Sequence, residues 1–115
     1  MEERFLIASK VKKTIVFLEK IVENFPNKEY LLKDHLLNAS YELLEFTYKA
    51  NLYKDSFYMK EALIKIKMIE YDIQKSLEKK FINFKKFETL GTHLLELNKM
   101  IRSWIIYEEK KKSIR

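Results

Sequence analysis

The chain carries few of the side chains that perform chemistry in helical proteins. Its two histidines, His35 and His93, each lack a second ligand four residues away, the spacing that places two metal ligands on one helix face. No glutamate stands three residues before either histidine, so the Glu-x-x-His ligand pair of di-metal bundles is missing. Cysteine is absent, which excludes thiolate metal sites and disulfides. We interpret both histidines as edge-of-core or surface residues and predict no metal and no cofactor.

Other catalytic arrangements are also excluded. A phosphate-binding loop needs several glycines, and Gly91 is the only glycine in the sequence. Acidic pairs such as Glu42 and Glu45 lie beside hydrophobic positions of one predicted helix, where they are expected to keep the surface soluble. We therefore predict a binding protein that is not an enzyme and has no small-molecule substrate.

The charge of the chain favours an anionic partner. Lysine and arginine number 23 and aspartate and glutamate 17, which gives a net charge of +6. Lysines act as point charges on phosphates and favour binding that depends little on base sequence. The candidate nucleic-acid-binding residues on outward helix positions are Lys12, Lys13, Lys20, Lys60, Lys67, Lys85, Lys86, Lys99 and Arg102. For any single lysine, the alternative is a solvated charge that nearby acids balance.

Long helices must position these residues, because one proline and one glycine leave almost nothing to interrupt a helix. Apolar side chains recur in steps of three and four and predict helices over about 7–25, 28–53, 56–77 and 83–104. We expect Asn27, Asp55 or Ser56, and Asn83 to cap the last three helices, and Gly91 to mark a close helix contact. The predicted core stripes are Val11, Ile15, Leu18, Val22 and Phe25; Leu32, Leu36, Ala39, Leu43, Phe46, Ala50 and Tyr53; Met59, Ala62, Ile66, Ile69, Ile73 and Leu77; and Phe87, Leu90, Leu94, Leu97, Ile101 and Trp104.

Short turns between these helices predict an all-α, antiparallel up-down-up-down four-helix bundle. We expect one domain over residues 1–107 and a basic, frayed tail over 108–115. Phe46, Ile66, Leu94 and Ile101 should be buried, and Trp104 should be buried near the end of the bundle. The sequence shows neither a signal peptide nor an apolar run long enough for a membrane span, so we predict a cytoplasmic protein with no membrane association.

Two of the helices carry a second apolar stripe opposite the core. A four-helix bundle has no further layer to cover such stripes, and exposed apolar patches rimmed by charge usually mark an association surface. We therefore predict a homo-oligomer, the alternative being tyrosines that simply decorate the surface. The predicted interface residues are Tyr30, Leu37, Tyr41, Tyr48 and Leu52, followed by Phe57, Ile64, Met68 and Tyr71.

Several short segments, in this order and spacing, resemble one known family over nearly the whole chain. They are Phe25-Pro26 with Lys28; Glu45, Ala50 and Lys54; Lys60-Glu61-Ala62; Lys86-Phe87-Glu88; and Glu96-Leu97, Lys99-Met100-Ile101 and Trp104-Ile105. With these segments the chain resembles the four-helix-bundle accessory proteins of diversity-generating retroelements, called Avd, which are related to proteins encoded in large-subunit rRNA intervening sequences.

The resemblance implies a basic homopentamer that associates with a reverse transcriptase and with template RNA, and that has no catalytic activity of its own. Binding to RNA, DNA or both is compatible with it. Members of the family usually carry arginines where this chain has Glu70 and Gln74. A structural homo-oligomeric adaptor of the rRNA intervening-sequence type, without a reverse-transcriptase partner, therefore stays open as the alternative.

Overall fold

The computed structural model describes the backbone of residues 3–114 and the side chains of residues 6–113. It contains four α-helices, α1 (Glu3–Val22), α2 (Tyr30–Tyr53), α3 (Ser56–Glu78) and α4 (Phe84–Ile114), with a short 3-10 turn, η1 (Asn27–Glu29), before α2. No strand occurs within residues 3–114. The predicted all-α fold with four helices is confirmed. Residues 1–2 and 115 of the predicted domain and tail lie outside the described residues.

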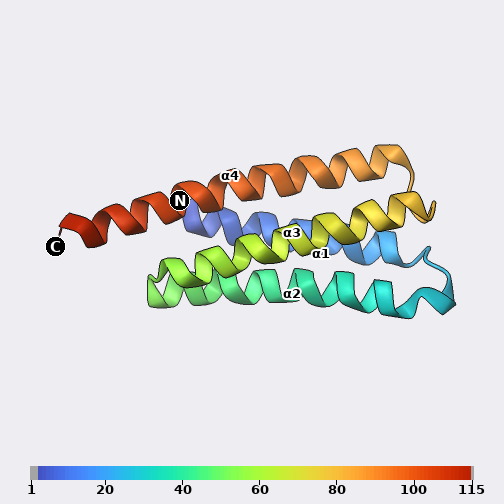
Figure 1. Cartoon of the computed structure of the whole chain (residues 1–115), viewed down its shortest axis with the longest axis horizontal. Helices are drawn as coiled ribbons and strands as arrows, with labels where there is room; N and C mark the ends of the chain where they lie inside the picture. Colours follow the sequence, from blue (N-terminus) through green and yellow to red (C-terminus); the bar gives the residue numbers. More distant parts are fainter. Residues whose placement is uncertain (1–2, 115) are drawn as a thin grey trace.

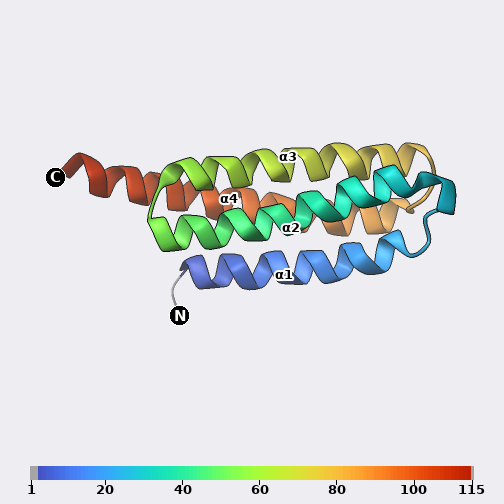
Figure 2. The same cartoon turned by 90° about the horizontal axis from the view of Figure 1, so that it is seen from below.

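The helices lie side by side and form a rod of 53 × 23 × 22 Å. Helix α1 packs against α2 and α4, and α3 also packs against α2 and α4, so α1 and α3 occupy opposite corners. The connections before α2 and before α4 lie at one end of the rod, and the turn between α2 and α3 lies at the other (Figures 1 and 2). The α1–α4 side therefore faces away from the α2–α3 side.

Side-chain caps explain where α3 and α4 begin. The Asp55 carboxylate accepts a hydrogen bond from the Phe57 amide at 3.0 Å, and the Asn83 side chain accepts one from the Lys86 amide at 2.8 Å. These two predicted caps are confirmed. The predicted Asn27 cap is wrong: Asn27 lies inside η1, and the start of α2 has no side-chain cap. The backbone makes this turn instead, because the Glu29 amide bonds to the Pro26 carbonyl at 2.9 Å.

The core follows the predicted stripes closely. Every predicted position of α1 is buried, as are Ile66, Leu94, Ile101 and Trp104. Three predictions on α2 are wrong, since Leu32 and Phe46 are only partly buried and Tyr53 is 58% exposed. The cause is helix geometry: a strict seven-residue repeat drifts by about 20° per heptad on a straight α-helix. The stripe that begins at Leu32 has therefore rotated out of the core when it reaches Tyr53.

Helix α4 differs from the prediction at two places. A Cβ built on Gly91 meets no atom within 4 Å, so the expected close helix contact at Gly91 is absent among the described residues. The helix also continues through Ile114, where we expected a frayed tail. Glu109 holds this extension by accepting a hydrogen bond from Lys60 at 3.0 Å. Figure 1 shows the end of α4 projecting past the turn between α2 and α3.

Candidate nucleic-acid interface

Two contacts mark the side on which α1 and α4 meet. Lys10 forms an ion pair with Glu96, and the Phe17 ring stacks on the His93 ring with centroids 6.1 Å apart. Positions three, four and seven residues from these contacts lie on the same side of their helix. The surface described next consists of exposed residues at such positions, together with Lys85, which stands eleven residues, or about three helical turns, before Glu96.

Four lysines form a row on this side, which we call the basic face: Lys13, Lys20, Lys85 and Lys99. Lys13 and Lys20 are seven residues apart on α1, and Lys85 and Lys99 are fourteen apart on α4. A rise of 1.5 Å per residue makes the row about 21 Å long. All four residues are exposed, and none forms an ion pair with any residue that the structure describes. The row is thus free to meet anionic groups.

Three carboxylates lie near this row: Glu23 and Glu88 are exposed, each three residues after a lysine of the row, and Glu96 is neutralised. The Glu96 carboxylate accepts a hydrogen bond from Lys10, and this hydrogen bond holds the pKa of the Glu96 carboxyl below its ordinary value. The charge of Lys99 lowers the pKa of Glu96 further. A carboxylate that already has a cationic partner repels an incoming phosphate less than a free one. The basic face therefore presents a net positive charge.

The other five predicted nucleic-acid-binding residues lie elsewhere. Lys12 faces α2, with its Nζ 5.7 Å from the centre of the Tyr48 ring. Lys60 and Lys67 pair with Glu109 and Glu70, at 3.0 and 4.0 Å.

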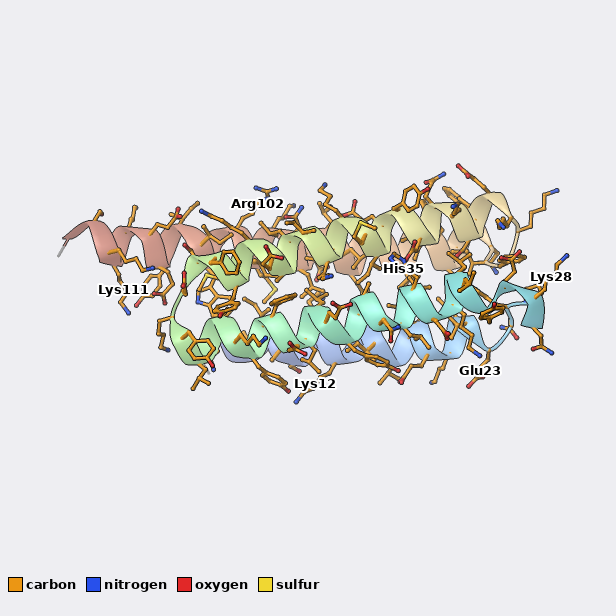
Figure 3. The ribbon with its side chains drawn as sticks, turned by 60° about the horizontal axis from the view of Figure 1, so that its bottom comes forward. Lys12, Glu23, Lys28, His35, Arg102 and Lys111 are labelled. Carbon is orange, nitrogen blue, oxygen red and sulfur yellow. The ribbon has the colours of Figure 1, made fainter. Side chains whose placement is uncertain are left out.

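Arg102 donates from Nε to the Asn98 side chain at 2.9 Å, and Lys86 is half-buried in the first turn of α4. Lys12 and Arg102 point outward from opposite edges of the bundle (Figure 3). The structure thus gathers four of the nine predicted residues into one row and disperses the rest.

The predicted interface residues form two separate apolar faces. The α2 apolar face consists of Tyr30, Leu37, Tyr41, Tyr48 and Leu52 and lies on the α1 side, where Tyr41 donates a hydrogen bond to Glu19 at 2.8 Å. The α3 apolar face consists of Phe57, Ile64, Met68 and Tyr71. Leu37 and Met68 are half-buried, and the other seven residues are exposed. These faces do not merge into one patch, because ion pairs lie between them.

Those ion pairs belong to a polar seam between α2 and α3. Lys65 pairs with Glu42 at 3.2 Å, and Lys49 pairs with Glu45 at 2.9 Å. A third pair joins His35 to the buried Asp72. Glu42 and Glu45 are therefore exposed surface acids, as the sequence suggested.

Sequence reasoning missed Asp72, which is 2% exposed. A signal existed, since this carboxylate interrupts the apolar stripe between Ile69 and Ile73. Its partner on α2 could not be read from the sequence, because the pairing depends on how α2 and α3 are aligned. The prediction that His35 is an edge-of-core or surface residue is confirmed, since its side chain is 51% exposed.

The described residues place further limits on the function. Between residues 6 and 113 no three histidine, aspartate or glutamate side chains come together as a metal site requires. None of the described helices combines the length and the apolar character needed to cross a lipid bilayer.

Comparison with models of known protein families gives no match. Comparison with curated proteins gives no significant match either. What this chain does must therefore be inferred from its own residues.

Proposed function

We propose that this chain is a non-catalytic accessory scaffold that binds nucleic acid through the basic face. It would be an antiparallel up-down-up-down four-helix bundle acting in the cytoplasm, as the Avd proteins that it resembles do beside a reverse transcriptase and its template RNA. The observation that supports nucleic-acid binding most is the row Lys13, Lys20, Lys85 and Lys99, which has no acidic partner among the described side chains.

The geometry of the row suits a phosphate backbone. Its lysines project from two packed helices, so their spacing is fixed and little backbone entropy is lost on binding. Ammonium groups contact phosphates without reading base edges, so binding should depend on charge more than on sequence. The basic face would bind RNA or DNA and would catalyse no reaction.

The proposed scaffold would also self-associate through its two apolar faces. Two different apolar faces on one chain favour head-to-tail contacts, in which the α2 apolar face of one copy meets the α3 apolar face of the next. Such contacts form a ring when the rotation between neighbouring copies closes. The resemblance implies five copies. A ring would repeat the basic face in every subunit and strengthen the positive field.

The second candidate is a structural homo-oligomeric adaptor without nucleic acid or reverse transcriptase. It is favoured by the neutralisation of Lys60 and Lys67 by Glu109 and Glu70, which removes two of the predicted phosphate contacts. The apolar faces are equally compatible with either function. Binding of nucleic acid therefore separates the two candidates.

The test is fluorescence anisotropy with labelled structured RNA and duplex DNA at low salt. One variant replaces Lys13, Lys20, Lys85 and Lys99 by alanine. The matched control replaces Lys49, Lys65, Lys75 and Lys79 on the opposite side, so both variants lower the net charge of +6 by four. Alanine preserves the helices, and breaking exposed ion pairs costs little stability.

We expect the basic-face variant to bind at least about tenfold more weakly than the wild type, because each lost phosphate contact also removes its counterion release. The control should retain most of the affinity. Equal losses in both variants would show that only total charge matters, and no binding by the wild type at low salt would favour the adaptor.

A further inference from the structure

The pair formed by His35 and Asp72 has a geometry that the proposed function does not use. The His35 Nδ1 lies 2.5 Å from the Asp72 Oδ2, across the seam between α2 and α3. The Asp72 side chain is 3% exposed, whereas the His35 side chain is 51% exposed. Figure 3 shows His35 between these two helices. One edge of the imidazole is thus held by a buried carboxylate while the ring itself reaches solvent.

This contact decides which ring nitrogen is reactive. An ionised Asp72 accepts a hydrogen bond from the Nδ1–H, so the lone pair of the neutral ring is on Nε2. The same carboxylate stabilises positive charge that develops on the ring when Nε2 attacks an electrophile. Burial raises the pKa of Asp72, and the hydrogen bond from His35 acts against that rise. The ring is therefore oriented as a nucleophile.

A groove of about 710 Å³ adjoins the pair. Leu31, Leu32 and Met68 form its apolar part. Two lysines stand at its rim: Lys75, whose Nζ lies 5.2 Å from the centre of the Tyr71 ring, and Lys79, which binds Glu29 at 3.2 Å.

The groove also includes the carboxylates of Glu29 and Asp34. Lys79 offsets Glu29, and Lys75 is the one lysine of the groove without an ion pair among the described side chains, although it also acts on the charge of Asp72. One lysine without an ion pair can neutralise one compact anionic group beside the imidazole, and the carboxylates of the groove disfavour a long polyanion.

We propose that His35 is a phosphoryl-acceptor site, with Nε2 as the nucleophile and an acyl phosphate as the donor. The Nε2 lone pair attacks phosphorus, the bond between phosphorus and the acyl oxygen breaks, and the donor leaves as a carboxylate. The product is a phosphohistidine whose Nδ1 proton remains hydrogen-bonded to Asp72. Lys75 neutralises the incoming phosphoryl oxygens. No redox partner or further proton is required.

This modification is independent of nucleic-acid binding. It would add roughly two negative charges, by analogy with other phosphorylated side chains. Those charges would appear on the α2–α3 side, away from the basic face.

The test uses the full folded chain and acetyl phosphate as the probe. Intact mass and phosphorus NMR follow the appearance of an acid-labile phosphoryl group, and peptide mapping assigns it to His35 or His93. His93 is the matched internal control, because its ring stacks on Phe17 and its Nδ1 has no hydrogen-bond partner in the described part of the chain. We expect modification of His35 only.

Three variants separate a reactive site from a purely structural contact. His35→Gln should abolish the modification, and His93→Gln should leave it unchanged. Asp72 is a positioning residue, so Asp72→Asn should slow phosphorylation by about tenfold, because the carboxylate no longer orients the ring or stabilises the positive charge that develops on it. Wild-type mapping that finds His35 and His93 modified equally, or an Asp72→Asn rate equal to that of the wild type, would overturn the proposal.

Discussion

Replacing Gly91 by alanine should stabilise this protein, although the sequence led us to expect a packed glycine. Gly91 lies inside α4 and has no positive φ, so alanine can adopt its backbone conformation without strain. Glycine costs about 1 kcal/mol relative to alanine in a helix interior. The added methyl group meets no atom within 4 Å, so no steric term opposes this gain.

The expected magnitude is therefore about 1 kcal/mol, which corresponds to a rise in Tm of about 4 °C for a chain of this size. Far-UV circular dichroism during thermal and urea unfolding measures both quantities. Ser103→Ala is the matched control, because Ser103 is exposed on the same helix, and it should gain at most about 0.5 kcal/mol.

A loss of stability in Gly91→Ala would refute this reasoning. The open groove beside Gly91 includes Phe87 and Leu95, so such a loss would mean that another chain covers it in the assembled protein. Measurements at two protein concentrations separate these cases, because only an assembly makes the Tm depend on concentration.

Three further predictions follow from burial and charge. Leu94→Ala should cost about 2–5 kcal/mol, since Leu94 is 1% exposed, and a loss below about 1 kcal/mol in urea unfolding would contradict its place in the core. Because burial raises the pKa of Asp72 above its ordinary 3.8, the unfolding free energy should fall as the pH rises from 3.8 through the raised pKa. Asp72→Asn should remove that slope, and an unchanged slope would contradict it. Replacing Tyr48 and Met68 together by lysine should dissociate the proposed oligomer in sedimentation experiments, because it buries charge at both apolar faces. A monomeric wild type at micromolar concentration would refute the oligomer.

Local signals in the sequence predicted the helices well. Asp55 and Asn83 cap their helices because a short polar side chain there can bond to an amide that has no partner inside the helix. The prediction failed at Asn27, where the backbone of the turn after Pro26 satisfies the amide of Glu29. Such competition between backbone and side chain depends on three-dimensional geometry and is invisible in the residue types.

Core positions could be predicted where the seven-residue apolar repeat matched the rotation of the α-helix. The positions on α1 remain buried over their whole length, whereas on α2 the drift of the repeat brings Tyr53 to the surface. The apolar repeat did not predict that two hydroxyl-bearing residues lie in the core. Ser40 and Thr47 are buried because the hydroxyl group of each donates a hydrogen bond to a carbonyl of its own helix.

The candidate site was only partly predictable. Outward positions can be assigned from one helix alone, so Lys13, Lys20, Lys85 and Lys99 were all identified. Which of them share a face depends on how α1 packs on α4. The neutralisation of Lys60 by Glu109 depends likewise on the helical extension of α4, which the charged composition of that segment did not indicate.

The most direct test of the proposed function is the salt dependence of duplex DNA binding. Each lysine–phosphate contact adds about 0.9 to the slope of log K against log salt, so the four lysines contribute about 3.6 per subunit. That slope corresponds to a loss of affinity of about 150-fold between 50 and 200 mM salt. The basic-face variant should lose about this much slope, and the control variant at Lys49, Lys65, Lys75 and Lys79 should keep it. Equal slopes for the wild type and the basic-face variant would contradict the assignment of nucleic-acid binding to this face.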